Sequence, residues 1–198
     1  MKRRRRALTV SLAVLIAFVG LSIAFGLALN GDAADYRGTA LLGDPVPALT
    51  LPDLDGDEVV LRGLRGKAVI INFFNSWCIP CKEEEPALQA FFAEHRDESD
   101  FAMLGIVRDD TDAAIRKWAR EREAGGLWTI LLDPGAKASV DFGTTGQPET
   151  FAVSADGRIV GIQRGRATVD DLENMLALAR GEKLQEDEPR DGERGDGG

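Results

Sequence analysis

Hydrophobic and polar positions along the middle of the chain predict strands that are separated by helices. Two apolar runs, residues 68–74 and 101–107, are nearly continuous, which is typical of strands buried on both faces of a sheet. The segments 78–92 and 112–123 instead place apolar residues three or four positions apart, as amphipathic helices do. The inward side chains of these two helices are expected to include Leu88, Phe91, Phe92, Ala114, Ile115 and Trp118.

Shorter elements are predicted ahead of and after this central pattern. Residues 44–67 are punctuated by Pro and Gly around short apolar pieces, with Asp55-Gly56 as a turn signal, and they predict a small hairpin. Residues 127–133 predict a third strand. Trp118 and Trp128 lie in these periodic apolar patterns, so we expect both indoles in the core.

The C-terminal part of the pattern predicts a hairpin and then a closing helix. Residues 149–154 and 158–164 flank an Ala-Asp-Gly turn and are expected to pair antiparallel. Residues 168–180 predict a helix with Thr168 as its N-cap. Strands that alternate with helices and end in a hairpin indicate an α/β fold with a central mixed sheet flanked by helices.

The N-terminal segment has a different character from this domain. Residues 7–29 contain no charge, and a helix of that length reaches about 34 Å, enough to cross a bilayer core of about 30 Å. Residues 2–6 are all Lys or Arg, and such a cluster stays in the cytoplasm. We therefore expect a cytoplasmic segment at 1–6 and a transmembrane signal-anchor helix at 7–29. A cleavable signal peptide is the alternative, although its apolar core is usually only about 7–15 residues long.

Composition and charge define the rest of the organisation. Residues 30–40 are interpreted as a polar linker, residues 41–180 as the globular domain outside the membrane, and residues 181–198 as a disordered acidic tail. Hydrophobic residues make up 44% of the chain, which is enough for the core of one domain. The formal net charge of −9 argues against nucleic-acid binding, because that function needs a basic face.

The two cysteines of the chain, Cys78 and Cys81, both lie where a buried strand is expected to meet a helix. A structural zinc site needs about four ligands, and the chain has a single imidazole, His95, which we interpret as a solvated residue near a helix end. An inert disulfide across so short a loop would remove little entropy from the unfolded chain. A redox-active dithiol fits better, because unpaired N–H groups at a helix N-terminus favour a Cys78 thiolate. Pro80 suits the first helical turn, and Cys81 would lie deeper.

These residues carry a resemblance to a known group of proteins. "FFNSWCIPC" looks like the Trp-Cys-x-x-Cys active site of the thioredoxin fold. With "PVPALTLPDLDG", "LGIVRDD", "LLDPGAKASVDFG" and "GQPETFAVSADGRIV", in that order, the chain resembles the extracytoplasmic reductases of cytochrome c maturation, the CcmG/DsbE, ResA and TlpA group. The resemblance covers about residues 41–180. It implies a thioredoxin-like fold with an N-terminal β-hairpin extension.

The resemblance also implies which residues form the site. It implies a cis peptide bond before Pro148, packed against the cysteine pair, with the Gln147 backbone turned toward the dithiol, where an extended substrate peptide could pair with it. Trp77 would flank the thiol and form part of the docking surface. Glu84, three residues after Cys81, would be partly buried and assist proton transfer. A solvated acidic turn is the alternative interpretation of this glutamate and its two neighbours.

Asn72 stands in the buried strand where thioredoxin itself holds a proton-accepting aspartate. An asparagine side chain cannot titrate, so a proton relay would instead use Glu84. The simpler interpretation is that Asn72 makes local hydrogen bonds.

By resemblance, the protein is a membrane-anchored extracytoplasmic thiol–disulfide oxidoreductase in which Cys78 attacks and Cys81 resolves a mixed disulfide, without metal or organic cofactor. The implied substrate is the Cys-x-x-Cys-His segment of apocytochrome c, reduced before haem attachment. The electron donor would be a membrane thiol carrier of the CcdA/DsbD type, because the compartment is oxidising. A general oxidase that forms disulfides in exported proteins is the main alternative, because Ile79-Pro80 between the cysteines does not determine direction.

Two further classes are less compatible with the motif. A thiol peroxidase would need a Thr and Pro frame just before the reactive cysteine, and "FFNSW" has neither residue. A non-catalytic interaction module would keep its function after the substitution Cys78→Ser.

Overall fold

The computed structural model describes Gly20 and residues 41–122 and 128–182. Within these residues, five strands form one mixed sheet in the order β5-β4-β3-β6-β7, and two strands form a separate hairpin. The strands are β1 (Thr50–Pro52), β2 (Glu58–Val60), β3 (Ala68–Phe74), β4 (Phe101–Val107), β5 (Thr129–Leu132), β6 (Glu149–Val153) and β7 (Ile159–Arg164).

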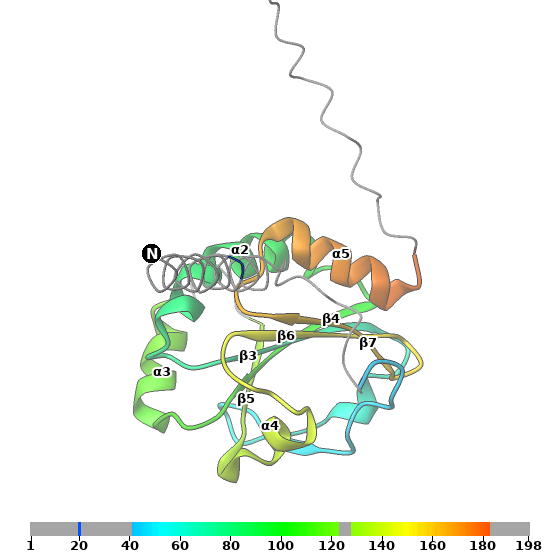
Figure 1. Ribbon diagram of the computed structural model, residues 1–198. Helices are drawn as coiled ribbons and strands as arrows, with labels where there is room; N and C mark the ends of the chain where they lie inside the picture. The colour runs from blue at the N-terminus through cyan, green and yellow to red at the C-terminus, as the bar shows by residue number, and fades with distance from the viewer. Residues whose placement is uncertain (1–19, 21–40, 123–127, 183–198) are drawn as a thin grey trace, which may run out of the picture. The chain divides into compact units, whose positions relative to one another are not determined.

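Helices cover both faces of the five-stranded sheet. The longer helices α2 and α5 lie side by side over one face, and the short helix α4 lies below the other (Figure 1). The helical segments are α2 (Ile79–His95), α3 (Asp112–Arg120), α4 (Lys137–Asp141), α5 (Val169–Arg180) and the short 3-10 turns η1 (Leu61–Leu64) and η3 (Pro134–Ala136).

The central strand β3 is buried along its whole length, as its apolar run predicts. Ala68, Ile70 and Phe74 belong to a core that also contains residues of α2, α3 and α5. Val69, Ile71 and Phe73 belong to a second core, with residues of the β1–β2 hairpin and α4. The alternation follows from strand geometry, because successive side chains point to opposite faces.

Strand pairing determines where the ends of the strands meet. β3 pairs parallel with β4 in a register that places Phe74 opposite Val107, so both strands end at the same edge. β3 pairs antiparallel with β6, and Phe73 lies opposite Glu149, so β6 begins at that edge too. Segments that follow β3 and β4, and the segment that precedes β6, are therefore brought together although they are far apart in the chain.

Most of the predicted elements are confirmed. The hairpin, the buried strands, the C-terminal hairpin and the closing helix are all present, and Thr168 caps α5 in a capping box. The helix predicted at 112–123 ends at Arg120. Both expected core indoles are buried, Trp118 at 6% and Trp128 at 2% exposure.

The helix α4 was not predicted, because it is only five residues long and depends on a buried carboxylate. Asp133 is 3% exposed and accepts hydrogen bonds from the backbone N–H groups of Ala138 and Ser139, at 2.8 and 2.9 Å. The Ser139 hydroxyl donates a third bond at 2.8 Å. Satisfying otherwise unpaired N–H groups allows this short turn to form.

The expectation that His95 is solvated is wrong. His95 is 7% exposed at the end of α2, and its two ring nitrogens lie 3.0 Å from Glu98 and 2.9 Å from Glu173. Burial lowers the pKa of His95, but the hydrogen bonds and charges of Glu173 and Glu98 raise it by more, so the net shift is upward. The imidazolium form satisfies both carboxylates, so His95 links the end of α2 to α5.

Apart from Gly20, Gly181 and Glu182, the two ends of the chain lie outside the described residues. These ends include the expected basic segment at 1–6, the anchor at 7–29, the linker at 30–40 and most of the tail at 181–198. Among the described residues, no helix combines the length and apolar character needed to cross a bilayer.

Candidate active site

The cysteine pair lies at the junction between β3 and α2. Cys78 is the N-cap of α2, and its sulfur accepts a hydrogen bond from the backbone N–H of Cys81 at 3.2 Å. The two cysteines are joined by a disulfide, and both are 5% exposed. Pro80 occupies the first turn, where a missing N–H leaves no intrahelical bond unmade. The predicted placement of Cys78 at the N-terminus of α2 and of Cys81 in its first turn is confirmed, but Cys81 is not the more shielded of the two.

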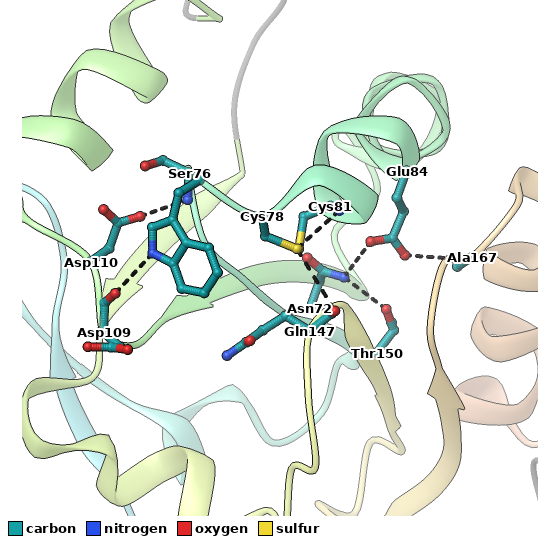
Figure 2. The surroundings of a disulfide bond; sticks show 11 residues. Asn72, Ser76, Cys78, Cys81, Glu84, Asp109, Asp110, Gln147, Thr150 and Ala167 are labelled. Atoms are coloured by element: carbon teal, nitrogen blue, oxygen red, sulfur yellow. Dashed lines mark hydrogen bonds between the residues drawn. A yellow bond between two sulfur atoms is a disulfide. The ribbon is translucent and has the colours of Figure 1, made fainter.

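The loop before β6 approaches the disulfide from the neighbouring strand. The Gln147–Pro148 peptide bond is cis, as the resemblance implies. The carbonyl oxygen of Gln147 lies 3.9 Å from the sulfur of Cys78 (Figure 2). On the other side, the carbonyl of Pro148 accepts a hydrogen bond from the Gly165 N–H at 2.9 Å. The backbone of Gln147 thus faces the dithiol, as expected.

Glu84 is the one inward-facing member of its acidic run. It is 2% exposed, whereas Glu83 is exposed and Glu85 is half-buried. One carboxylate oxygen accepts a bond from the Ala167 backbone N–H at 2.8 Å. Burial raises the pKa of Glu84 to about 7, against the opposing hydrogen bonds from Ala167 and Asn72. A carboxyl group with this pKa exchanges a proton readily near neutral pH.

Asn72 connects Glu84 to the start of β6. Its amide nitrogen donates to Glu84 at 3.3 Å and to the Thr150 hydroxyl at 3.0 Å. The side chain is fully buried beneath the disulfide (Figure 2). The interpretation of Asn72 as a hydrogen-bonding residue is confirmed. Thr150 was not predicted, because its role depends on the pairing of β3 with β6, which places the two residues opposite each other.

Two apolar side chains are exposed beside the dithiol. Trp77 is 56% and Ile79 is 69% exposed, although large hydrophobic residues usually avoid water. They directly precede and follow Cys78 in the chain. Their exposure agrees with a docking surface that a protein substrate would cover.

A second buried carboxylate, that of Glu149, holds the loop before β6. Glu149 is 2% exposed and accepts bonds from the Thr145 N–H at 2.8 Å, the Thr145 hydroxyl at 2.6 Å and the Gly146 N–H at 3.1 Å. Arg164 forms an ion pair with it at 2.9 Å. Sequence reasoning missed this role, because Glu149 looks like a strand residue, and only the fold shows its partners.

Comparison with known proteins places the chain among thiol–disulfide oxidoreductases. A family model described as AhpC/TSA matches residues 42–162. The thiol:disulfide interchange protein CycY of Rhizobium leguminosarum bv. viciae is 31% identical over 186 residues, covering 86% of this chain and 92% of the relative. The thiol–disulfide oxidoreductase ResA of Bacillus thuringiensis is 28% identical, covering 82% of this chain and 92% of the relative.

A solved structure agrees with these sequence relationships. The thioredoxin domain of a thiol–disulfide oxidoreductase from Bacteroides vulgatus has a TM-score of 0.60 and 26% identity, covering 70% of this chain and 96% of that domain. The predicted thioredoxin-like fold is confirmed. The cysteine pair, with its two-residue spacing at a helix N-terminus, matches the chemistry that these relatives share. The chain therefore belongs to the AhpC/TSA family, and it is a thiol–disulfide oxidoreductase similar to ResA and CycY.

Proposed function

We propose that this protein reduces disulfides of exported proteins from the outer side of a membrane, with Cys78 as the nucleophile. The observation that supports Cys78 as the nucleophile is its position, because Cys78 caps α2 and contacts the Gln147 carbonyl at 3.9 Å. A helix N-terminus stabilises a thiolate, and the half-buried Gln147 backbone beside it can pair with an extended peptide.

The reaction proceeds by two thiol–disulfide exchanges. The Cys78 thiolate attacks one sulfur of the substrate disulfide, forming a mixed disulfide and releasing the other substrate sulfur as a thiolate. Cys81 then attacks the sulfur of Cys78, which closes the Cys78–Cys81 disulfide and releases the second substrate sulfur. Two electrons pass to the substrate, and two protons accompany them.

In this scheme, Glu84 accepts the proton from Cys81 and later donates one back. Cys81 must lose its proton before it attacks, and Glu84 lies one helical turn further along α2 with a pKa of about 7. Glu84 takes this proton in the resolving step, and it returns a proton when Cys81 is reduced again. Asn72 holds the carboxylate in place through its amide nitrogen.

The substrate that we propose is the Cys-x-x-Cys-His segment of apocytochrome c, reduced before haem attachment. The resemblance to the CcmG/DsbE, ResA and TlpA group supports this choice. The apolar segment at 7–29 would anchor the protein, and its basic flank would keep residues 1–6 in the cytoplasm. A membrane thiol carrier of the CcdA/DsbD type would supply the electrons.

A covalent trap tests the substrate and the direction of electron flow. The variant Cys81→Ala lacks the resolving thiol, so the mixed disulfide on Cys78 should persist in cells. We expect apocytochromes c and a membrane thiol carrier among the captured proteins, and none with the control Cys78→Ser/Cys81→Ala. Capture of many unrelated exported proteins would instead indicate the general oxidase, and no capture by an exposed, free Cys78 would refute the redox role.

The membrane anchor is tested separately. The full chain should stay in the membrane fraction during extraction with alkaline carbonate, and it should keep residues 1–29 by mass spectrometry. Release into the soluble fraction together with loss of these residues would show that the segment is a cleaved signal peptide.

A further inference from the structure

The loop that joins β4 to α3 holds the two residues that directly precede Cys78. The backbone N–H of Ser76 donates to the Asp110 carboxylate at 2.7 Å (Figure 2). The ring N–H of Trp77 donates to the backbone carbonyl of Asp109 at 3.1 Å. These bonds span more than thirty positions in sequence, and they are made because β3 and β4 end at the same edge of the sheet.

The loop is itself built to be rigid at this point. The second oxygen of the Asp110 carboxylate accepts the Thr111 N–H at 2.8 Å. The Thr111 hydroxyl in turn caps α3, accepting from the Ala114 N–H at 3.2 Å. Asp109 has φ of +53°, a left-handed conformation that aspartate adopts more readily than most residues. The loop is thus connected to the start of α3, and it offers a fixed acceptor pair to the segment before Cys78.

Ser76 and Trp77 lie between two buried residues, Asn75 at 1% and Cys78 at 5% exposure. Between the end of β3 and the cap of α2, the Cys78 N–H bonds to the Asn75 carbonyl at 3.2 Å. Trp77 is more than half exposed, so packing alone would leave its ring free to change rotamer. Hydrogen bonds to a carboxylate are stronger than those between neutral groups, so Asp110 is a strong restraint on the Ser76 backbone.

We propose that Asp110 is a positioning residue for the dithiol, which holds the Ser76 backbone and thereby fixes where Cys78 presents its sulfur. The backbone carbonyl of Asp109 accepts the hydrogen bond from the Trp77 ring and thereby keeps this ring in one orientation at the docking surface. This inference rests on the proposed function, because it concerns the same attacking sulfur. Neither aspartate exchanges electrons or protons with the substrate, and both act through the residues that they bind.

The physical basis of the expected effect is alignment. Attack on a disulfide requires the incoming sulfur to lie on the axis of the bond that breaks, and a misplacement of about 1 Å can reduce a rate up to about 100-fold. The bonds from Cys78 to Asn75 and Cys81 remain in an Asp110→Ala variant. We therefore expect its reduced form to react with a model peptide disulfide about tenfold more slowly than the wild type does. Asp110→Asn, which keeps one acceptor oxygen, should stay within about threefold of the wild type.

Asp53→Ala is the matched control. Asp53 is also half-buried, at the turn that follows β1, and its carboxylate also accepts two backbone N–H bonds, from Asp55 and Asp57 at 2.9 Å each. Both Ala variants should lower the midpoint of urea unfolding by similar amounts, because they remove similar bonds. Only Asp110→Ala should slow the exchange reaction.

Fluorescence gives a readout that a general loss of stability would not change. Trp118 and Trp128 are 6% and 2% exposed, whereas Trp77 is 56% exposed, so iodide quenches chiefly the emission of Trp77. In Asp110→Ala, the iodide-quenchable emission should show a larger fast component of anisotropy decay, which reports a more mobile ring. In Asp53→Ala, this component should match the wild type.

The outcomes separate the two proposals. If the wild type itself fails to react with the peptide disulfide, the proposed function fails. If the wild type reacts and Asp110→Ala reacts equally fast, only the positioning role is overturned. Equal slowing in Asp110→Ala and Asp53→Ala, in proportion to lost stability, would also overturn it.

Discussion

Removing the charge of Glu84 should flatten the dependence of stability on pH. Glu84 is 2% exposed, and burial raises its pKa from 4.5 to about 7 in the folded protein. In the unfolded chain the carboxyl group is solvated and titrates near its ordinary value. The substitution Glu84→Gln keeps the shape of the side chain and abolishes this titration.

The sign and size of the effect follow from these two pKa values. Between pH 4.5 and pH 7 the folded protein holds a proton on Glu84 that the unfolded chain has already lost. The folded state therefore becomes less stable as the pH rises through this window, by about 1.4 kcal/mol for each pH unit. Over the whole window, Glu84 contributes about 3 kcal/mol to the free energy of unfolding. This contribution is complete below pH 4.5 and is lost above pH 7.

Urea unfolding of the oxidised protein measures this effect, because the cysteines then do not titrate. The difference in unfolding free energy between the wild type and Glu84→Gln should change by about 3 kcal/mol from pH 4.5 to pH 8, in favour of the variant at high pH. Glu83→Gln is the control, since Glu83 is exposed and pairs with Arg166 at 2.9 Å. Parallel stability profiles of the wild type and Glu84→Gln would refute the raised pKa and the proton-transfer role that depends on it.

Three further substitutions test other features of the fold. His95→Gln should be less stable than the wild type, by most near pH 6 and by less as the pH rises through the raised pKa of His95. The reason is that the neutral ring cannot donate hydrogen bonds to both Glu98 and Glu173. A stability difference independent of pH would contradict this. Gly105→Ala should lower the free energy of unfolding in urea by about 2 kcal/mol, because the added methyl group would come within 2.8 Å of three core side chains. Stability equal to that of the wild type would show that these side chains rearrange to accommodate the methyl group. Thr168→Ala should cost about 1 kcal/mol in the same assay by removing the capping box of α5, and an unchanged midpoint would mean that the cap is dispensable.

Local sequence patterns were sufficient for most of the secondary structure. A strand buried on both faces needs a continuous apolar run, and residues 68–74 and 101–107 both have one. A helix cap requires a short polar side chain at the right position, so Thr168 could be assigned from the sequence. The helix α4 could not, because its five residues are stabilised by Asp133, and nothing local indicates that this aspartate is buried.

Exposure of single polar residues needed the tertiary structure. His95 lies between charged neighbours in the sequence, which suggests a solvated side chain. Its partner Glu173 is 78 positions away on α5, so only the packing of α2 against α5 buries the ring. For Glu84, helix geometry indicated only that at most one of the three adjacent glutamates faces the dithiol, and the resemblance indicated which one.

The sequence by itself determined the chemistry of this protein, because two cysteines two residues apart, between a buried strand and a helix, place one sulfur at a helix N-terminus. Only the tertiary structure decided what surrounds that sulfur. Gln147, Asp110 and Thr150 reach the site through the pairing of β3 with β4 and β6, whose register no local pattern specifies. Contacts between distant segments depend on which strand ends meet. The reactive pair could therefore be identified from local spacing, Gln147 and Glu84 only through the resemblance, and Asp110 and Thr150 only from the structure.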